Sequence, residues 1–371
     1  LLLETYRMAL LYIYLTFFTI YFFVLTLATF KQNRKFRDKY TPKDANLCVV
    51  VYATGKADTL ENLIKQLKNQ NYPTNNYTIY AILDKCENVS EVTLQTESNV
   101  NVVNIDNLEP IGKSQAYSII AEKLHDVKDL DAYVFLDSNF YVESDFLANV
   151  NFYLTRSDVF QPMINYLPQE ESMLFWQKLK SVYSRYVSKF IYLSRSKLGF
   201  TNIINTDAFV IKKDILNKIA NFDYRDLISE VNYTLKLANE AIKVDFIDDI
   251  NIYTSVNNFK LRIPSLSKRL GILFHNFFKS NNVLAKEFLI SQAVPNWLVF
   301  VLGYYMLIRH VYVFPFMVSY LFVLITILLF ALAFIVSTSS AKLFAKEYMY
   351  LFVYPLYSIF RVVYNFILQN L

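Results

Sequence analysis

Between residues 47 and 253, short apolar runs alternate with amphipathic stretches. The run at 47–52 is unbroken and rich in β-branched side chains, which is typical of a strand that is covered on both faces. Leu60, Leu63 and Leu67 then recur at helical spacing and predict a helix with one apolar side. The alternation predicts an α/β domain with a mostly parallel sheet and flanking helices. Further strands are expected at 77–83, 100–105 and 132–136, and a further helix at 114–124.

A longer apolar segment precedes this domain. Residues 8–30 contain no charged side chain and match the roughly 20 residues that cross a bilayer. The segment is too long for a signal peptide and lacks a small-residue cleavage site, so we predict an uncleaved helix that starts outside the cell. Basic residues follow it and place its end in the cytoplasm by the positive-inside rule. These residues are Lys31, Arg34, Lys35, Arg37 and Lys39.

Apolar segments also follow the domain. Residues 261–278 mix basic and apolar side chains and predict a helix in the membrane interface. Two apolar stretches, at 297–308 (extending back toward Ile290) and 312–336, are separated by Arg309 and His310. The last segment, 348–368, carries Arg361 and either spans the membrane or lies at its surface. We predict four membrane-spanning helices, and three would also agree with the sequence. The expected units are 1–44, 45–257, 258–288 and 289–371.

Composition supports a membrane protein of one large domain. The chain of 371 residues is 54% hydrophobic and 17% aromatic, which is too apolar for an ordinary soluble protein. Its net charge of +5 is modest, and the most compact basic cluster adjoins the first helix, which favours anionic lipid over nucleic acid as a partner. Only five glycines are present and no glycine-rich phosphate loop occurs, so a nucleotide would be held by side chains and strand ends. Frequent Asn, Lys, Ile and Tyr fit a bacterial source with an AT-rich genome.

Polar residues cluster where the predicted strands end. Because parallel strands deliver their carboxyl ends to one edge of a sheet, these residues are expected to meet there. Asp84 and Asp137 follow two of these strands. Four segments occur in a fixed order along the chain: Gln70-Asn71-Tyr72-Pro73, Asp84-Lys85-Cys86-Glu87-Asn88, Gly112-Lys113 and Asp137-Ser138-Asn139. Their order resembles that of family 2 glycosyltransferases, membrane-embedded proteins of the GT-A fold that include processive polysaccharide synthases. The resemblance covers about residues 45–280 and implies a cytoplasmic catalytic domain between apolar helices.

The resemblance implies a nucleotide site. It assigns Asp84, Lys113 and Asp137 to nucleotide binding, where a carboxylate can accept the imide hydrogen of uracil and a lysine supplies a compact cation. Asp137 and Asn139 take the place of the family's paired aspartates, which hold Mg²⁺ or Mn²⁺ at the diphosphate. Asn139 removes one negative charge from this pair, so we expect a lower affinity for the cation. The family's aromatic platform for the base has no counterpart at its usual position, unless Tyr52 takes its place.

The resemblance also implies an acceptor side. Ile228-Ser229-Glu230 corresponds to the family's Thr-Glu-Asp, so Glu230 is the candidate general base, or else a carboxylate that stabilises a helix N-terminus. Asn205-Thr206-Asp207-Ala208-Phe209 resembles the acceptor-site turn Asn-Gly-Thr-Gly-Phe and makes Asn205 and Asp207 acceptor-side candidates. The family's Gln-x-x-Arg-Trp has no Gln or Trp here, and only Lys268 and Arg269 remain.

Three functions fit these residues. We favour a membrane-embedded, family-2-like transferase that has become a weak or inactive subunit, a pseudoenzyme, in extracellular polysaccharide synthesis or export. One alternative is an active inverting glycosyltransferase that uses a UDP-sugar donor and Mg²⁺ or Mn²⁺. The other is a structural membrane partner of a true synthase. The expected partners are the lipid bilayer, UDP or a UDP-sugar, and other subunits of the complex, with the domain on the cytoplasmic side of the plasma membrane.

Overall fold

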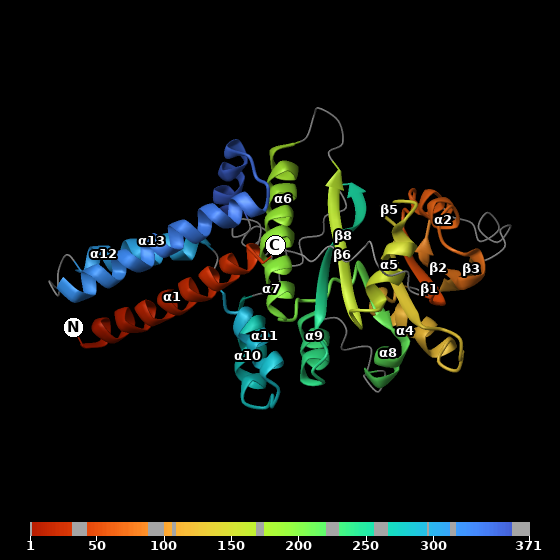
Figure 1. The fold of residues 1–371 in the computed structure, drawn as a ribbon, viewed down its shortest axis with the longest axis horizontal. Coiled ribbons are helices and arrows are strands. Elements are labelled where there is room, and N and C mark those ends of the chain that lie inside the picture. Colours follow the sequence, from red (N-terminus) through yellow and green to blue (C-terminus); the bar gives the residue numbers. More distant parts are fainter. Residues whose placement is uncertain are drawn as a thin grey trace.

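The computed structural model describes residues 2–31, 43–87, 100–105, 109–167, 174–219, 230–255, 266–294, 297–311 and 317–357. It places an α/β domain at one end and a group of long helices at the other (Figure 1). The basic residues after position 31 and Arg361 lie outside the described residues.

Eight strands of the described chain form one mixed sheet in the order β3-β2-β1-β4-β7-β6-β8-β5. Four neighbouring pairs are parallel, and the reversed strands are β7 and β5. The strands predicted from the sequence are confirmed as β1 to β4. The bounds are β1 (Leu47–Gly55), β2 (Tyr77–Cys86), β3 (Val100–Ile105), β4 (Ala132–Asp137), β5 (Phe140–Val142), β6 (Val159–Leu167), β7 (Ala208–Lys212) and β8 (Val244–Ser255).

Helices cover both faces of the sheet. Alternate side chains of β1 point to opposite faces, so Val49 and Val51 pack against α2 (Leu60–Lys68) and α5 (Phe146–Leu154). On the other face Val50 packs with α4, α8 and α9. All three valines of β1 are fully buried, which is the pattern that an unbroken apolar run predicts. The bounds of the second group are α4 (Lys113–Lys123), α8 (Lys213–Ile219) and α9 (Glu230–Asn239).

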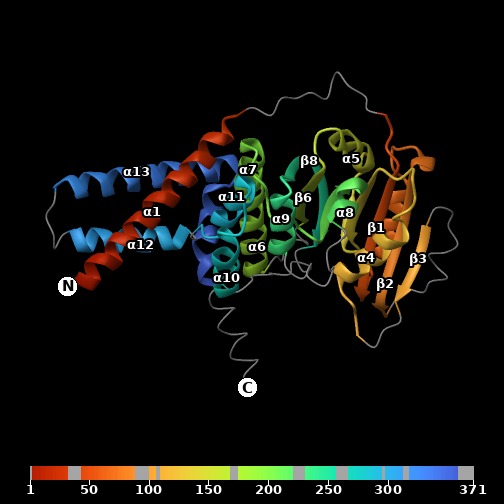
Figure 2. The ribbon, with the colours of Figure 1, turned by 90° about the horizontal axis from the view of Figure 1, so that it is seen from below.

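A continuous helical rod separates the sheet from the long helices (Figures 1 and 2). It consists of α6 (Phe175–Tyr186), a π-helical turn η2 (Val187–Tyr192) and α7 (Leu193–Leu198). Phe190 in the π-turn is fully buried and packs edge-on against Phe22 of the first helix, with ring centroids 5.1 Å apart. The neighbouring Lys189 lies 3.5 Å from a carboxylate oxygen of Asp248 in β8. The π-turn therefore contacts both ends of the molecule.

The long helices α1, α12 and α13 contact one another and project away from the sheet (Figure 2). In α1 and α13, the segments Tyr6–Thr29 (24 residues) and Tyr320–Ser340 (21 residues) are long and apolar enough to cross a membrane. The third helix, α12, has 15 residues, fewer than the roughly 20 required. The bounds are α1 (Leu2–Thr29), α12 (Trp297–Val311) and α13 (Met317–Ser340).

Two details of the predicted C-terminal segments change. Arg309 and His310 were expected between two helices, but both lie within α12, which continues to Val311. Residues 348–357 are helical and the rest of 348–368 lies outside the described residues. Shorter helices link the sheet to this region, and the side chains of Lys268 and Arg269 are not among the described ones. The linking helices are α10 (Leu266–Phe277) and α11 (Val283–Ser291), and the 3₁₀ turn Ala345–Glu347 follows α13.

Close packing joins α1 to α12. A Cβ atom at Gly303 would come within 2.5 Å of Leu15 Cδ1, so a larger residue there would require the Leu15 side chain to move. One turn away, the hydroxyl groups of Thr19 and Tyr304 share a hydrogen bond of 2.5 Å. Because both hydroxyl groups are buried among apolar side chains, this bond fixes the register of the two helices.

Candidate functional site

The predicted site residues come from five segments that meet at one edge of the sheet. Asp84 lies near the end of β2 and Asp137 ends β4, and both strands flank β1. Lys113 is the first residue of α4, and Glu230 is the first of α9. Asp207 immediately precedes β7, and its carbonyl oxygen accepts a hydrogen bond of 2.8 Å from the Asp137 amide.

Asp84 is fully buried and bound by the protein itself. One carboxylate oxygen accepts hydrogen bonds from the Tyr52 hydroxyl (2.7 Å) and the Gly112 amide (3.0 Å), and the other from the Ile111 amide (3.2 Å). Burial raises the pKa of Tyr52, and its bond to Asp84 raises it further, so the phenol stays a donor at neutral pH. Gly112 has φ = 85°, a conformation that favours glycine and turns its amide toward the carboxylate. Asp84 therefore fastens the start of α4 to the sheet.

Lys113 bridges two carboxylates. Its ammonium group forms ion pairs with Asp137 Oδ2 and with Asp207 Oδ1. The Lys113 side chain is 9% exposed and that of Asp137 is 15% exposed. The ring of Tyr52 lies on a further side, with its centroid 6.0 Å from the ammonium nitrogen. The lysine thus joins the end of β4 to the turn before β7.

Asn139 turns its amide nitrogen toward Asp137. Asp137 Oδ1 accepts bonds from the Asn139 backbone amide (3.0 Å) and from its Nδ2 (2.8 Å). The Asn139 oxygen lies 3.4 Å from the Thr59 hydroxyl, which also donates to the Ser138 carbonyl at 2.8 Å. In this arrangement Asp137 and Asn139 do not present two oxygens to one Mg²⁺ or Mn²⁺ ion. Within the described ranges, no group of three acidic, histidine or cysteine side chains could hold a metal.

The acceptor-side candidates form a compact turn before β7. Asn205 Oδ1 accepts the Asp207 amide at 3.0 Å, and the Asn205 amide donates to Gln161 Oε1 at 2.8 Å. Glu230 Oε1 accepts the Thr206 hydroxyl at 3.0 Å and the Thr206 amide at 3.4 Å. Glu230 therefore lies against the turn that the sequence assigns to the acceptor, and it is linked through this turn to Lys113.

Sequence reasoning missed Tyr166, which lies in β6 near its end. Burial raises the pKa of its phenol, and the negative charge of Asp207 raises it further. Its hydroxyl also bonds to Ser184 in α6, so it connects the site to the helical rod. Tyr166 lies near the end of a strand whose carboxyl end reaches the same edge of the sheet as the site. The sequence could have indicated it by this position, but the strand itself was not predicted.

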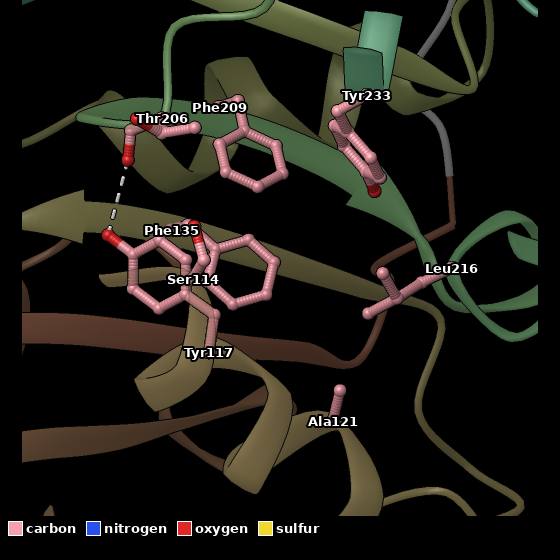
Figure 3. Close-up of a pocket in the computed structure, with 8 residues that line it drawn as sticks. All are labelled: Ser114, Tyr117, Ala121, Phe135, Thr206, Phe209, Leu216 and Tyr233. Atoms are coloured by element: carbon pink, nitrogen blue, oxygen red, sulfur yellow. Dashed lines mark hydrogen bonds between the residues drawn. The ribbon is translucent and has the colours of Figure 1, made fainter. Parts of the chain in front are cut away.

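A separate, small apolar pocket of about 20 Å³ lies beneath this edge (Figure 3). None of the seven predicted site residues lines it. The Tyr117 hydroxyl donates a hydrogen bond to the Thr206 carbonyl oxygen at 3.3 Å, drawn as a dashed line in Figure 3. It belongs to the core between α4 and α9, and we assign the chemistry to the polar edge above it. It is lined by Ser114, Tyr117, Ala121, Phe135, Thr206, Phe209, Leu216 and Tyr233.

Comparisons identify the fold. No protein-family model and no curated protein matches the sequence. Among solved structures, the mannosyltransferase PcManGT from Pyrobaculum calidifontis, in complex with GDP-Man and Mn²⁺, is similar over 94% of this chain and 96% of its own, with 13% identity and a TM-score of 0.52. TarS 1–349 from S. aureus covers 67% and 71%, with 11% identity and a TM-score of 0.44, too low to carry an argument. At such identities the likeness concerns the fold alone. The chain has a glycosyltransferase-type α/β fold, and it carries two helices that are long and apolar enough to cross a membrane.

Proposed function

We propose that the protein is a membrane-embedded, family-2-like glycosyltransferase of weak or no activity, which serves as an accessory subunit in the synthesis or export of an extracellular polysaccharide. The observation that carries the proposal is the state of the site. The side chains that would contact a nucleotide sugar form hydrogen bonds and ion pairs with other groups of the protein instead. Asp84 is buried and accepts hydrogen bonds from three protein donors, and Lys113 pairs with two carboxylates.

Electrostatics supports weak binding of a nucleotide. The predicted site residues include four formally charged carboxylates, of Asp84, Asp137, Asp207 and Glu230, and one ammonium group, of Lys113, which pairs with two of them, so three formal negative charges remain. A nucleoside diphosphate adds further negative charge to a partly buried site, where screening by solvent is weak. To enter, it would have to separate Lys113 from both partners. Each of these effects lowers the affinity.

The active alternative rests on one specific observation, the convergence of Glu230 with the acceptor-side turn. If a donor opened the lysine bridge, Glu230 would release the Thr206 hydroxyl and accept a proton from an acceptor hydroxyl. The extra methylene of glutamate relative to the family's aspartate displaces this base, and a displacement of about 1 Å can lower a rate roughly a hundredfold.

Titration with UDP separates these functions. We expect wild-type protein in detergent to bind UDP with a Kd weaker than about 1 mM, corresponding to roughly 4 kcal/mol of binding free energy, with or without Mn²⁺. Isothermal titration calorimetry measures the affinity, and release of sugar from a UDP-sugar measures turnover. Micromolar binding with turnover would overturn the proposal. In that case Glu230→Gln should lower kcat at least about a hundredfold with unchanged UDP affinity, because a general base acts in the transition state.

The long helices support a membrane location. Their apolar side chains remain exposed along the whole length of α1 and α13, although three-helix packing has buried one side of each. Soluble monomers rarely expose an apolar surface of this extent. Examples are Leu10, Ile13, Phe17, Leu321, Leu328 and Ile335.

A charge on this surface tests the location. Leu328 is 60% exposed near the middle of α13, so Leu328→Arg should disfavour insertion by about 2.5–3.5 kcal/mol. We expect a smaller fraction of the protein in the membrane pellet after an alkaline wash. Val127→Arg, at an exposed apolar residue of the α/β domain, is the matched control and should leave that fraction unchanged. Wild-type protein that is monomeric and soluble without detergent would contradict the location.

A further inference from the structure

The geometry points to Lys113 as a built-in cation that takes the place of a divalent metal ion between Asp137 and Asp207. This inference deepens the proposed function, since it concerns the same site. It assigns the site an internal ammonium group, whereas the mannosyltransferase of similar fold is described in complex with Mn²⁺.

The two carboxylates form the kind of site that a cation requires. Asp137 comes from the end of β4 and Asp207 from the turn before β7, and both direct an oxygen to the same nitrogen atom. Magnesium and manganese prefer such oxygens at about 2.0–2.2 Å, whereas an ammonium group offers three hydrogen-bond donors to the same oxygens. The lysine and a metal ion cannot occupy this position together.

The lysine is placed there by its neighbours. Asp84 holds the Gly112 amide at 3.0 Å, and Gly112 has the positive φ that starts α4 at Lys113. Tyr52 holds Asp84 through its hydroxyl, and its ring lies near the ammonium group. Asp84 and Tyr52 are therefore positioning residues for the lysine.

A lysine in place of a divalent metal ion changes the net charge of the site. An ammonium group supplies one positive charge, and the two carboxylates already compensate it, whereas a divalent ion would supply two. Lys113 can therefore neutralise less of an incoming diphosphate than a metal does. A neutral Asn139 beside Asp137 is compatible with this arrangement, because an ammonium group needs fewer anionic ligands than Mn²⁺.

Removal of the lysine should create a metal site. We expect Lys113→Met to bind Mn²⁺ at least about tenfold more tightly than wild type, because it leaves Asp137 and Asp207 facing each other without a cation. The loss of the electron paramagnetic resonance signal of free Mn²⁺, with the metal alone as probe and the full chain in detergent, measures binding. Asp137→Asn added to Lys113→Met should abolish the gain.

Two further variants make the result decisive. Lys123→Met removes an exposed lysine from the other end of α4 and should behave as wild type. Lys113→Gln, which keeps a donor for the carboxylates, replaces the methionine variant if that variant does not fold. Equal Mn²⁺ affinity in wild type and Lys113→Met would overturn the inference, as would a folded variant without any gain. Because no nucleotide is present, neither outcome depends on whether the protein binds UDP or transfers a sugar.

Discussion

Arg195→Met is expected to lower the free energy of unfolding by roughly 3 kcal/mol, since it leaves the largely buried Glu287 carboxylate, 15% exposed, without its charged partner. Two guanidinium nitrogens of Arg195 donate to the two oxygens of Glu287, each at 2.8 Å. Nε and Nη2 of the same arginine also donate to the Thr201 carbonyl, at 3.1 and 2.6 Å. The Arg195 side chain is only 5% exposed, so little water can replace these bonds.

This ion pair joins the two parts of the molecule. Arg195 belongs to α7 of the helical rod and Glu287 to α11, and the Tyr21 hydroxyl of α1 donates to Glu287 at 2.9 Å. Loss of the arginine should therefore loosen the first apolar helix as well as α11. Thermal unfolding in detergent, with near-ultraviolet circular dichroism as the signal, measures the change.

The exposed pair of Lys218 and Glu240 provides the matched control. Its charged atoms lie 2.9 Å apart, yet both side chains are about half exposed, so Lys218→Met should change stability by less than about 1 kcal/mol. The double variant Arg195→Met with Glu287→Leu should be more stable than Arg195→Met alone, because no unpaired charge remains buried. Equal midpoints for Arg195→Met and Lys218→Met would show that the buried pair adds nothing.

Asp84→Ala is expected to destabilise the α/β domain by about 3 kcal/mol, because one buried donor and two partly buried donors lose their acceptor, at roughly 1–3 kcal/mol for a buried one. These donors are the Tyr52 hydroxyl and the amides of Ile111 and Gly112. The carboxylate also faces the first turn of α4, where a negative charge is favourable. The midpoint of chemical unfolding, followed by the fluorescence or circular dichroism of the full chain, measures the loss.

Two comparisons sharpen this second experiment. Tyr52→Phe removes only one of the three donors, so it should have a smaller effect, near 1 kcal/mol. Asp126→Ala removes a carboxylate that is fully exposed beyond the other end of α4, and it should leave the midpoint unchanged. A stable Asp84→Ala variant would mean that Asp84 is available for a ligand, as the family resemblance implies.

Much of the α/β domain can be predicted from the local pattern of apolar and polar residues. The predicted strand 100–105 has the observed bounds of β3, and the predicted helix 114–124 differs from α4 by one residue at each end. Both agree because β3 is a short, β-branched run, and because Ala116, Ile120 and Leu124, which are buried on one side of α4 and at its end, recur at helical spacing. The reversed strand β7 was not predicted, since direction in a sheet depends on partners far along the chain.

The sequence predicts where the site residues lie, but it does not predict which of their side chains bond to one another. The order of Asp84, Lys113 and Asp137 along the chain predicts that they approach one edge of the sheet. It does not reveal that Lys113 bonds to Asp207, which lies 94 residues away. Nor does it reveal the rod that carries Arg195, because α6 and α7 meet through a π-helical turn that shifts the period of their apolar side chains.

The close contact between α1 and α12 has a consequence for biosynthesis. Thr19 and Tyr304 are separated by 285 residues, so their hydrogen bond waits until nearly the whole α/β domain has left the ribosome. At about 5–20 residues per second this interval lasts roughly 15 to 60 seconds. During that time, on the proposed membrane location, α1 resides in the bilayer with Thr19 and the surface around Leu15 exposed. The nascent chain is then open to capture by an insertase or by another subunit, and the arrival of Gly303 ends that period.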